Sequence, residues 1–433
     1  TSNRPSTQDQ RVSSTGFQMC PEAGMTSTSC FRRIAVRIKT GRPICCSTRL
    51  ALPRTMDESR DSPAAAAWRT KSGSQPYTKS CPRRQHAVHF TPDFSIDERT
   101  GQRYAYYNKP FALRHFLQHA SPLVNETTIA LLDPDMVLLS PVTPYTGPSE
   151  VMFSTGHPVD EVRGDEIYWV TRGYPVAQAY MYGGKWALWP DLSEIVPANS
   201  PALGLSEAYA AKHYAVGPPL LAHSYDWLLL ADKWAELVPG VLERHPGLLS
   251  EMQAFSIAAA HLRLPATQAR SYMVSDAKVE TGAEGWELVE GMAPLDVCRS
   301  PTRLVASGRR LPNVLHYCQM YRAGVYMFGK RREELHDVFR CGGPLLLEPP
   351  RHAAKLKVRV HPGPRVETVA AATATRNAFG VCVATKAVNE AIADYRQRYC
   401  PPVVGKPAPP LRLTDLPPKA IADTKRWKEA EAV

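Results

Sequence analysis

Two aspartates separated by one residue end an apolar run. Residues 127–139 read TTIALLDPDMVLL, so Asp133 and Asp135 flank Pro134 between two apolar stretches. In an extended chain alternate side chains point the same way, which lets both carboxylates face one ligand. Carboxylate oxygens bind Mg²⁺ or Mn²⁺, and these ions commonly complete their shells with substrate phosphates. The spacing predicts a metal-dependent site for a substrate such as a nucleotide sugar; the alternative is a surface turn, because Asp and Pro favour turns.

The neighbouring segments predict how these aspartates are held. The run before Asp133 is too short for a helix and continuously apolar, which is typical of a buried strand. Before it, Asn108 and Pro110 could begin a helix as N-cap and first-turn residue. That helix would have one apolar face and one polar face, formed by Ala112, Leu113, Phe116, Leu117 and Ala120 and by Arg114, His115, Gln118 and His119. A helix that leads into an acidic strand end predicts an α/β fold with its ligand at the carboxyl ends of strands.

Two later segments predict further helices and candidate groups. Residues 227–238 carry an apolar stripe of Trp227, Leu228, Ala231, Trp234, Ala235 and Val238, which indicates core packing. Ser250 could cap a following helix that turns Met252, Phe255, Ala259 and Leu262 to one side. Glu251 would lie in the first turn of this helix, where the helix dipole favours a carboxylate. Its role could be structural alone or part of a site.

Several motifs, in this order along the chain, resemble one family of enzymes. The motifs are Arg99-Thr100-Gly101, Tyr107-Asn108-Lys109-Pro110, Leu131–Met136, Arg172–Tyr180, Leu249–Ala258, Val314–Cys318 and Gly342-Gly343-Pro344. Together they resemble the peptidyl-serine α-galactosyltransferases and hydroxyproline O-arabinosyltransferases of plants and algae, over about residues 89–350. Val388-Asn389-Glu390-Ala391 extends the resemblance. It implies a GT-A-like fold with a mixed central sheet flanked by helices, a UDP-sugar donor, Mn²⁺ or Mg²⁺, a Ser- or hydroxyproline-rich acceptor protein, retention of configuration, and the Golgi.

The resemblance also implies roles for individual residues. Asp133, Asp135 and His316 would hold the metal, because a late histidine that follows a strand such as Asn313-Val314-Leu315 often completes the shell in such enzymes. Asn108, Lys109 and Lys330 would join Asp133 in binding the donor, and Glu251 would join the aspartates in catalysis. Outside a metal site, His316 would be an ordinary hydrogen-bonding residue. Lys330, Arg331 and Arg332 would approach the diphosphate or form a solvated basic turn.

A metal-bound His316 must be neutral, because a protonated ring has no lone pair to give. Metal affinity is therefore expected to fall as the pH drops through the range of an unperturbed histidine, near ~6.5. This expectation separates a ligand from a histidine that only makes hydrogen bonds.

Two other function classes fit parts of the chain. Leu132–Val137 also resembles the nucleophile motif of haloacid-dehalogenase-type phosphatases, in which the first aspartate attacks phosphate. That class needs a later acidic pair on a loop, and the sequence contains no convincing Asp-Asp or Gly-Asp pattern. The other class is a catalytically inactive glycan-binding relative. The first strand of the resembled family, which would hold the nucleotide base, is not recognisable in residues 1–88, and residues 150–165 and 193–217 look like insertions or divergent loops.

Charge and composition divide the 433-residue chain. Residues 1–90 contain 15 Lys and Arg against 5 Asp and Glu, so they hold most of the formal net charge of +11. Only Phe31 and Trp68 lie directly beside these charges, so we interpret residues 1–85 as a basic, poorly ordered or misassigned segment with no nucleic-acid partner. We predict a glycosyltransferase-like domain over residues 86–350. A C-terminal extension with a helix follows over residues 351–400, and a Pro-rich polar tail over residues 401–433.

Compartment is predicted from the resemblance and from the cysteines. The sequence has no run near the ~18 apolar residues of a membrane span and no signal-peptide pattern, although the resemblance implies a membrane anchor. Five of the ten cysteines lie in residues 1–90 in no metal-binding spacing. The others could form disulfides in a secretory compartment, with the pairing left open: Cys298, Cys318, Cys341, Cys382 and Cys400.

Overall fold

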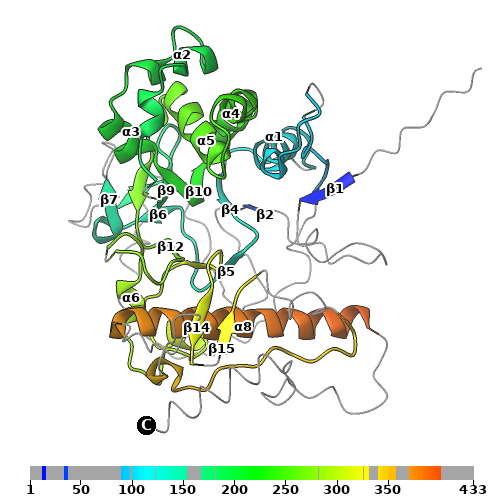
Figure 1. Ribbon diagram of the computed structural model, residues 1–433, viewed down its shortest axis with the longest axis vertical. Helices are drawn as coiled ribbons and strands as arrows, with labels where there is room; N and C mark the ends of the chain where they lie inside the picture. The colour runs from blue at the N-terminus through cyan, green and yellow to red at the C-terminus, as the bar shows by residue number, and fades with distance from the viewer. Residues whose placement is uncertain are drawn as a thin grey trace, which may run out of the picture.

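The computed structural model describes residues 12–15, 34–37, 89–97, 100–121, 123–153, 167–180, 182–280, 282–324, 326–330, 340–356 and 370–400. Within this part the chain is a mixed α/β protein with two sheets, each next to its own helices (Figure 1).

The larger sheet has six strands and is mixed. In spatial order these are β2 (Ile34–Arg37), β4 (Thr128–Leu132), β10 (Val216–His223), β9 (Val176–Ala179), β11 (Thr267–Ala269) and β7 (Val151–Phe153). Only the β9–β11 pairing is parallel. All five residues of β4 are buried, which confirms the buried strand predicted from its apolar run.

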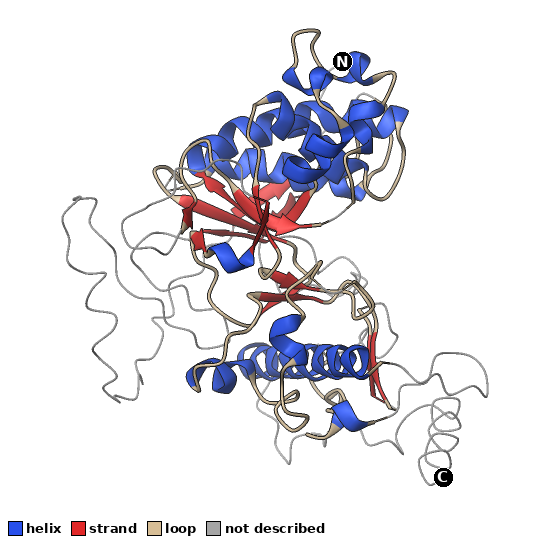
Figure 2. Ribbon diagram, turned by 90° about the vertical axis from the view of Figure 1, so that its left-hand side faces the viewer, coloured by secondary structure: helices blue, strands red, loops and turns tan. Residues whose placement is uncertain are grey.

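Helices cover one face of this sheet (Figure 2). They are α1 (Asn108–His119), α2 (Leu192–Ile195), α3 (Glu207–Tyr214), α4 (Ser224–Arg244) and α5 (Ser250–His261). The long helix α4 packs against α1, α5, β4 and β10. The predicted stripe of α4 is buried except for Leu228, which is 39% exposed because it lies at the edge of the stripe. The mixed sheet with flanking helices agrees with the predicted fold class at this level.

Two predicted helix caps are wrong. Helix α1 begins at Asn108 itself, after Tyr107. Helix α5 begins at Ser250, after Leu249, and neither cap residue makes a side-chain capping bond. The Ser250 hydroxyl instead donates to the carbonyls of His245 and Gly247, at 2.7 and 2.9 Å. Residues 193–217 are not a loop, since they include most of α2, all of α3 and the start of β10.

The smaller sheet has its own hydrophobic core. It contains β12 (Met273–Val274), β13 (Val314–His316) and β5 (Met136–Leu138), in that order. The 29-residue helix α8 (Ala371–Tyr399) packs against β5, β13 and the hairpin of β14 (Tyr321–Ala323) and β15 (Tyr326–Phe328). Short helices α6 (Glu287–Glu290) and α7 (Pro301–Ala306) contribute Val289 and Leu304 to the same core. Helix α8, predicted in the C-terminal extension, therefore shares a core with the domain before it.

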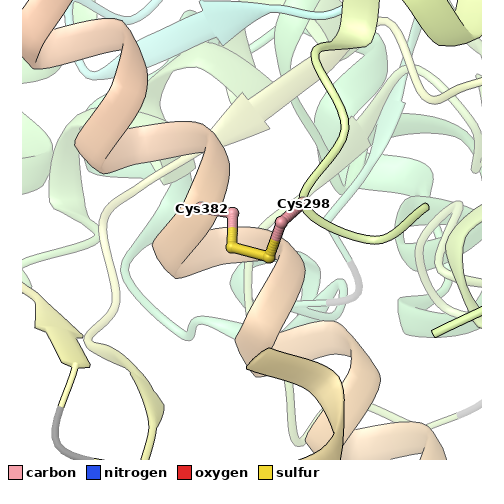
Figure 3. Close-up of a disulfide and its surroundings, with 2 residues drawn as sticks. All are labelled: Cys298 and Cys382. Carbon is pink, nitrogen blue, oxygen red and sulfur yellow. A yellow bond between two sulfur atoms is a disulfide. The ribbon is translucent and has the colours of Figure 1, made fainter. Parts of the chain in front are cut away.

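Two disulfides fix α8. Cys298 bonds to Cys382 inside the helix (Figure 3), and Cys341 bonds to Cys400 just after it. Cys318 is the free cysteine among the described residues. The pairing that the sequence left open is thereby given for these five cysteines.

The remaining elements are short. Besides the β14–β15 hairpin, two strand pairs in the described residues lie outside the two larger sheets: β1 (Val12–Thr15) with β3 (His89–Pro92), and β6 (Tyr145–Thr146) with β8 (Tyr168–Trp169). The 3₁₀ helices are η4 (Ala105–Tyr107), η5 (Pro148–Glu150), η6 (Lys185–Leu188), η7 (Pro201–Gly204) and η9 (Ala353–Lys355). No helix in the described ranges is both long enough and apolar enough to cross a membrane.

The N-terminal segment is described only at β1 and β2. Strand β2 pairs antiparallel with β4, so this segment contributes an edge strand to the larger sheet. No first strand was recognised in residues 1–88 from the sequence, although the Ile and Val residues of β2 favour strands. The rest of residues 1–85, the predicted tail at residues 401–433 and Arg331 and Arg332 lie outside the described residues.

Candidate functional site

The two aspartates lie on the connection between the two sheets. Strand β4 of the larger sheet ends at Leu132, and β5 of the smaller sheet begins at Met136. Asp133-Pro134-Asp135 is therefore the whole connection. The carboxylates lie at the end of a buried strand, as the sequence predicted, and strands from both sheets set their positions.

His316 reaches the same place through strand pairing. Strand β13 runs antiparallel to β5, and this register puts His316 opposite Met136. The backbone N–H of Tyr317 donates to the carbonyl of Asp135 at 3.0 Å, which ties the two strand ends together. His316 Nε2 then lies 3.2 Å from Asp135 Oδ1. The structure thus brings His316 next to Asp135, as a shared metal site would require.

Tyrosine side chains position His316. The hydroxyl of Tyr321 donates to the carbonyls of Ser275 and His316, at 2.6 and 3.1 Å, and holds the end of β13. On the ring, Nδ1 lies 3.4 Å from the hydroxyl of Tyr180, which directly follows β9. Burial lowers the pKa of His316, but hydrogen bonds with Asp135 and Cys318 outweigh it and raise this pKa to about 10.

The sequence analysis did not name Tyr180 or Cys318 as site residues. Both were nevertheless inside quoted motifs, Arg172–Tyr180 and Val314–Cys318. Each of these residues lies near the end of a strand and inside a motif, and this position could have marked it as a candidate. The sequence did not show, however, that the ends of β9 and β13 meet. The contact between these strand ends depends on how the two sheets lie relative to each other.

Two lysines neutralise the aspartates. Lys109 Nζ lies 2.8 Å from Asp133 Oδ1 and 3.6 Å from Glu251 Oε1. Lys330, just beyond β15, makes an ion pair with Asp135 Oδ2. Burial alone raises the pKa of the Asp135 carboxyl, but His316 and Lys330 together hold it well below its ordinary value. Asp135 therefore stays ionised throughout the neutral pH range.

Glu251 and Asn108 differ in their relation to this cluster. Glu251 is buried in the first turn of α5 and joins the cluster through Lys109. The side-chain amide of buried Asn108 accepts from the N–H of Phe94 at 2.7 Å and donates to Asp93 at 3.1 Å. These bonds hold the turn after β3 against the start of α1. We therefore leave Asn108 out of the groups proposed below to bind a ligand.

The donor set fits a hard divalent cation. One ligand atom from each of Asp133, Asp135 and His316 can be chosen so that all three lie within 4.8 Å of one another. Two carboxylates and an imidazole suit Mn²⁺, and carboxylates with substrate oxygens suit Mg²⁺. Lys109 and Lys330 bring further positive charge to the same carboxylates. The site therefore gathers acids, an imidazole and two ammonium groups from segments far apart in the sequence.

Comparison with known proteins gives a partial match to an enzyme whose activity is known. The chain is 27% identical to the peptidyl serine alpha-galactosyltransferase of Arabidopsis thaliana over 213 residues, which cover 46% of this chain. The match covers 22% of that relative's own length. No family model matches the chain, and no solved structure matches it. The chain is thus a distant, partial relative of a plant glycosyltransferase.

Proposed function

We propose that this chain is a metal-dependent glycosyltransferase with a GT-A-like fold, which transfers a sugar from a UDP-sugar to a serine or hydroxyproline hydroxyl of a protein. The observation that carries the proposal is the convergence of Asp133, Asp135 and His316 at the junction of the two sheets. The partial similarity to a peptidyl serine galactosyltransferase supports the substrate class. Galactose and arabinose are the sugars to test.

The chemistry needs positive charge at the leaving diphosphate. Breaking the bond between sugar and nucleotide leaves negative charge on the diphosphate oxygens, and preorganised cations stabilise that charge. Asp133, Asp135 and His316 would hold Mn²⁺ or Mg²⁺, which when bound supplies Lewis-acid stabilisation to phosphate oxygens. The Lys330 side chain is 36% exposed and its ammonium group lies against Asp135, so this group can donate to the same diphosphate.

The acceptor would be bound on the Lys109 and Glu251 side of the cluster. Glu251 carries a buried carboxylate that lies near the Asp133–Lys109 pair. Such a carboxylate can accept hydrogen bonds from sugar or acceptor hydroxyls and so orient them. Orientation of the acceptor oxygen at the anomeric carbon supplies a large part of the rate enhancement. We propose retention of configuration and a Golgi setting, which are the expectations that the family resemblance of the sequence carries.

Release of UDP from UDP-galactose and UDP-arabinose, with a Ser- and hydroxyproline-rich peptide and Mn²⁺, tests the proposal. Turnover should require Mn²⁺ and be lost in Asp135→Asn, which removes the charge but keeps the shape. Asp232→Asn, at an exposed carboxylate on α4, is the matched control and should keep full activity. Phosphate release without UDP would identify a phosphatase instead. Binding of sugar with no turnover of either kind would identify an inactive glycan-binding relative.

A further inference from the structure

A pocket lies beside α8 and shares no residue with the aspartate cluster. Its volume is about 560 Å³, within the range of small-molecule sites. Three segments meet there: the turn before α7 with α7 itself, the loop at Arg351, and the middle of α8. None of the residues that line it belongs to the site of the proposed transfer reaction.

The walls of this pocket are fixed to α8. The Cys298–Cys382 disulfide joins the segment before α7 to the helix (Figure 3). One side of the 346–351 segment is held by Asn389, whose amide accepts from the N–H of Leu346 at 2.8 Å. The same amide donates to the Leu346 carbonyl at 2.9 Å and to Glu348 at 3.0 Å. The backbone segments that form the pocket are thus held to α8 by a disulfide and by hydrogen bonds.

Positive charge predominates in the lining. Four cations, Arg299, Arg303, Arg351 and Lys386, face two carboxylates, Asp296 and Glu390. Arg299 is paired with Asp296 at 3.2 Å. Arg303 and Arg351 make no ion pair with any residue in the described ranges, and Lys386 has Glu390 one helical turn away on α8. The pocket therefore keeps an excess of positive charge that an anion would neutralise.

The two kinds of charge together define the ligand. Arginine forks and a lysine ammonium bind phosphate or sulfate oxygens, and arginine does so with two parallel hydrogen bonds. A bare inorganic anion would be repelled by Glu390, whereas a ligand with hydroxyl groups can donate hydrogen bonds to that carboxylate and to Ser300. The lining thus suits one molecule that carries both an oxyanion and hydroxyls.

From this arrangement we infer that the pocket beside α8 binds a phosphate or sulfate ester of a sugar. The ester oxygens meet Arg303, Arg351 and Lys386, and the sugar hydroxyls meet Glu390 and Ser300. The inference does not depend on the proposed transferase activity, because neither the metal-binding residues nor their lysines line the pocket.

Calorimetric titration with glucose 6-phosphate, in EDTA and at low ionic strength, tests the inference without turnover. The full chain should bind it saturably, and Arg303→Gln and Lys386→Gln should each weaken binding at least tenfold. Lys355→Gln changes the charge equally in η9, outside the pocket, and should bind as the parent does. Arg351→Gln replaces either variant that fails a thermal-melting check of folding. Absence of binding by the parent chain, or equal loss in Lys355→Gln, would overturn the site.

Further ligands identify the ester and the role of the hydroxyls. Glucose 6-sulfate in parallel shows which ester is preferred, and tighter binding of either one supports the inference. Glucose should not bind, and inorganic phosphate should bind more weakly than glucose 6-phosphate. Glu390→Gln should bring the affinities for inorganic phosphate and glucose 6-phosphate closer together. The substitution removes the charge that repels phosphate and the carboxylate that accepts hydrogen bonds from the sugar hydroxyls. Inorganic phosphate binding as tightly as the sugar ester would overturn the assignment of a sugar ligand.

Discussion

At the scale of single residues, Lys109 bridges two carboxylates from distant segments. Its side chain is 13% exposed and lies between Asp133 and Glu251. Removal of the cation from a buried cluster leaves its partners uncompensated, which costs more than the net strength of the pairing. The position of Lys109 therefore matters to folding as well as to any ligand.

Lys109→Met should lower the free energy of unfolding by about 2–4 kcal/mol, somewhat less than for fully buried pairs because Asp133 is partly exposed. Adding Glu251→Gln should recover part of this loss, because it removes one of the two uncompensated charges. Urea unfolding of the two single variants and the double variant measures the coupling. Lys278→Met, at an exposed lysine, should stay within about 0.5 kcal/mol of the parent. Additive effects of the two substitutions would show that Lys109 and Glu251 do not interact.

His316 determines how metal binding depends on pH. With its pKa raised to about 10 beside Asp135, the ring is protonated at neutral pH before any metal binds. A metal ion needs the neutral ring, so binding must release this proton. The metal affinity should therefore keep rising with pH well above ~6.5, where it would begin to level off for an unperturbed histidine.

Mn²⁺ affinity should increase by up to tenfold per pH unit between about pH 6 and 8, with close to one proton released per ion. Titrations in buffers of different ionisation enthalpy measure that proton. His316→Ala should bind Mn²⁺ more weakly and release almost none. A flat pH profile for the parent chain would contradict a three-residue metal site and leave only the aspartates as ligands.

At the scale of elements, the contact between β9 and β10 positions Tyr180. A Cβ atom built on Gly217, at the start of β10, would lie 2.4 Å from carbons of the Tyr180 ring. No side chain fits there while the ring stays in place. The ring hydroxyl in turn lies beside His316 Nδ1, so the absence of a side chain at Gly217 affects the site.

Gly217→Ala should therefore displace the Tyr180 ring, lower stability by about 1–3 kcal/mol as overpacking usually does, and weaken Mn²⁺ binding. Gly204→Ala is the matched control, since a Cβ atom there meets nothing within 4 Å. Thermal unfolding and Mn²⁺ titration are the measurements. Equal behaviour of the two alanine variants would show that the Tyr180 ring does not depend on Gly217.

At the scale of the whole molecule, the chain has two main cores joined by the residues of the site. One core lies between the helices and the six-stranded sheet, and the other lies between α8 and the smaller sheet. The Asp133–Asp135 connection joins the two sheets directly. Any loosening of α8 would therefore disturb β13, and with it His316, because α8 packs on both β5 and β13.

Loss of the Cys298–Cys382 disulfide tests how strongly α8 is held to the rest of the chain. The double substitution by Ser opens a link across 84 residues and should lower stability by about 2–5 kcal/mol. Urea unfolding without reductant gives the stabilities, and mass spectrometry of blocked thiols gives the pairing. Recovery of free Cys298 and Cys382 from the oxidised chain would contradict this disulfide.

The sequence by itself determined the local structure around the site. A continuous apolar run gave β4, helical spacing of apolar residues gave the buried faces of α1 and α4, and the paired acids gave the candidate position at a strand end. These features depend on periodicities over a few residues, so they can be recognised without knowing the rest of the fold. The caps at Asn108 and Ser250 were wrong because both side chains make longer-range or loop hydrogen bonds instead.

Only the tertiary structure decided which distant groups meet. The register of β13 with β5 brings His316 to Asp135. Helices α1 and α5 both pack on α4, and this arrangement brings Lys109 to both Asp133 and Glu251. Tyr180, strand β2 beside β4 and the disulfide partners were likewise undetermined by the sequence. Such contacts join segments whose separation along the chain carries no periodic signal. They are selected by the shapes of whole sheets and helices packing together, which a local pattern does not specify.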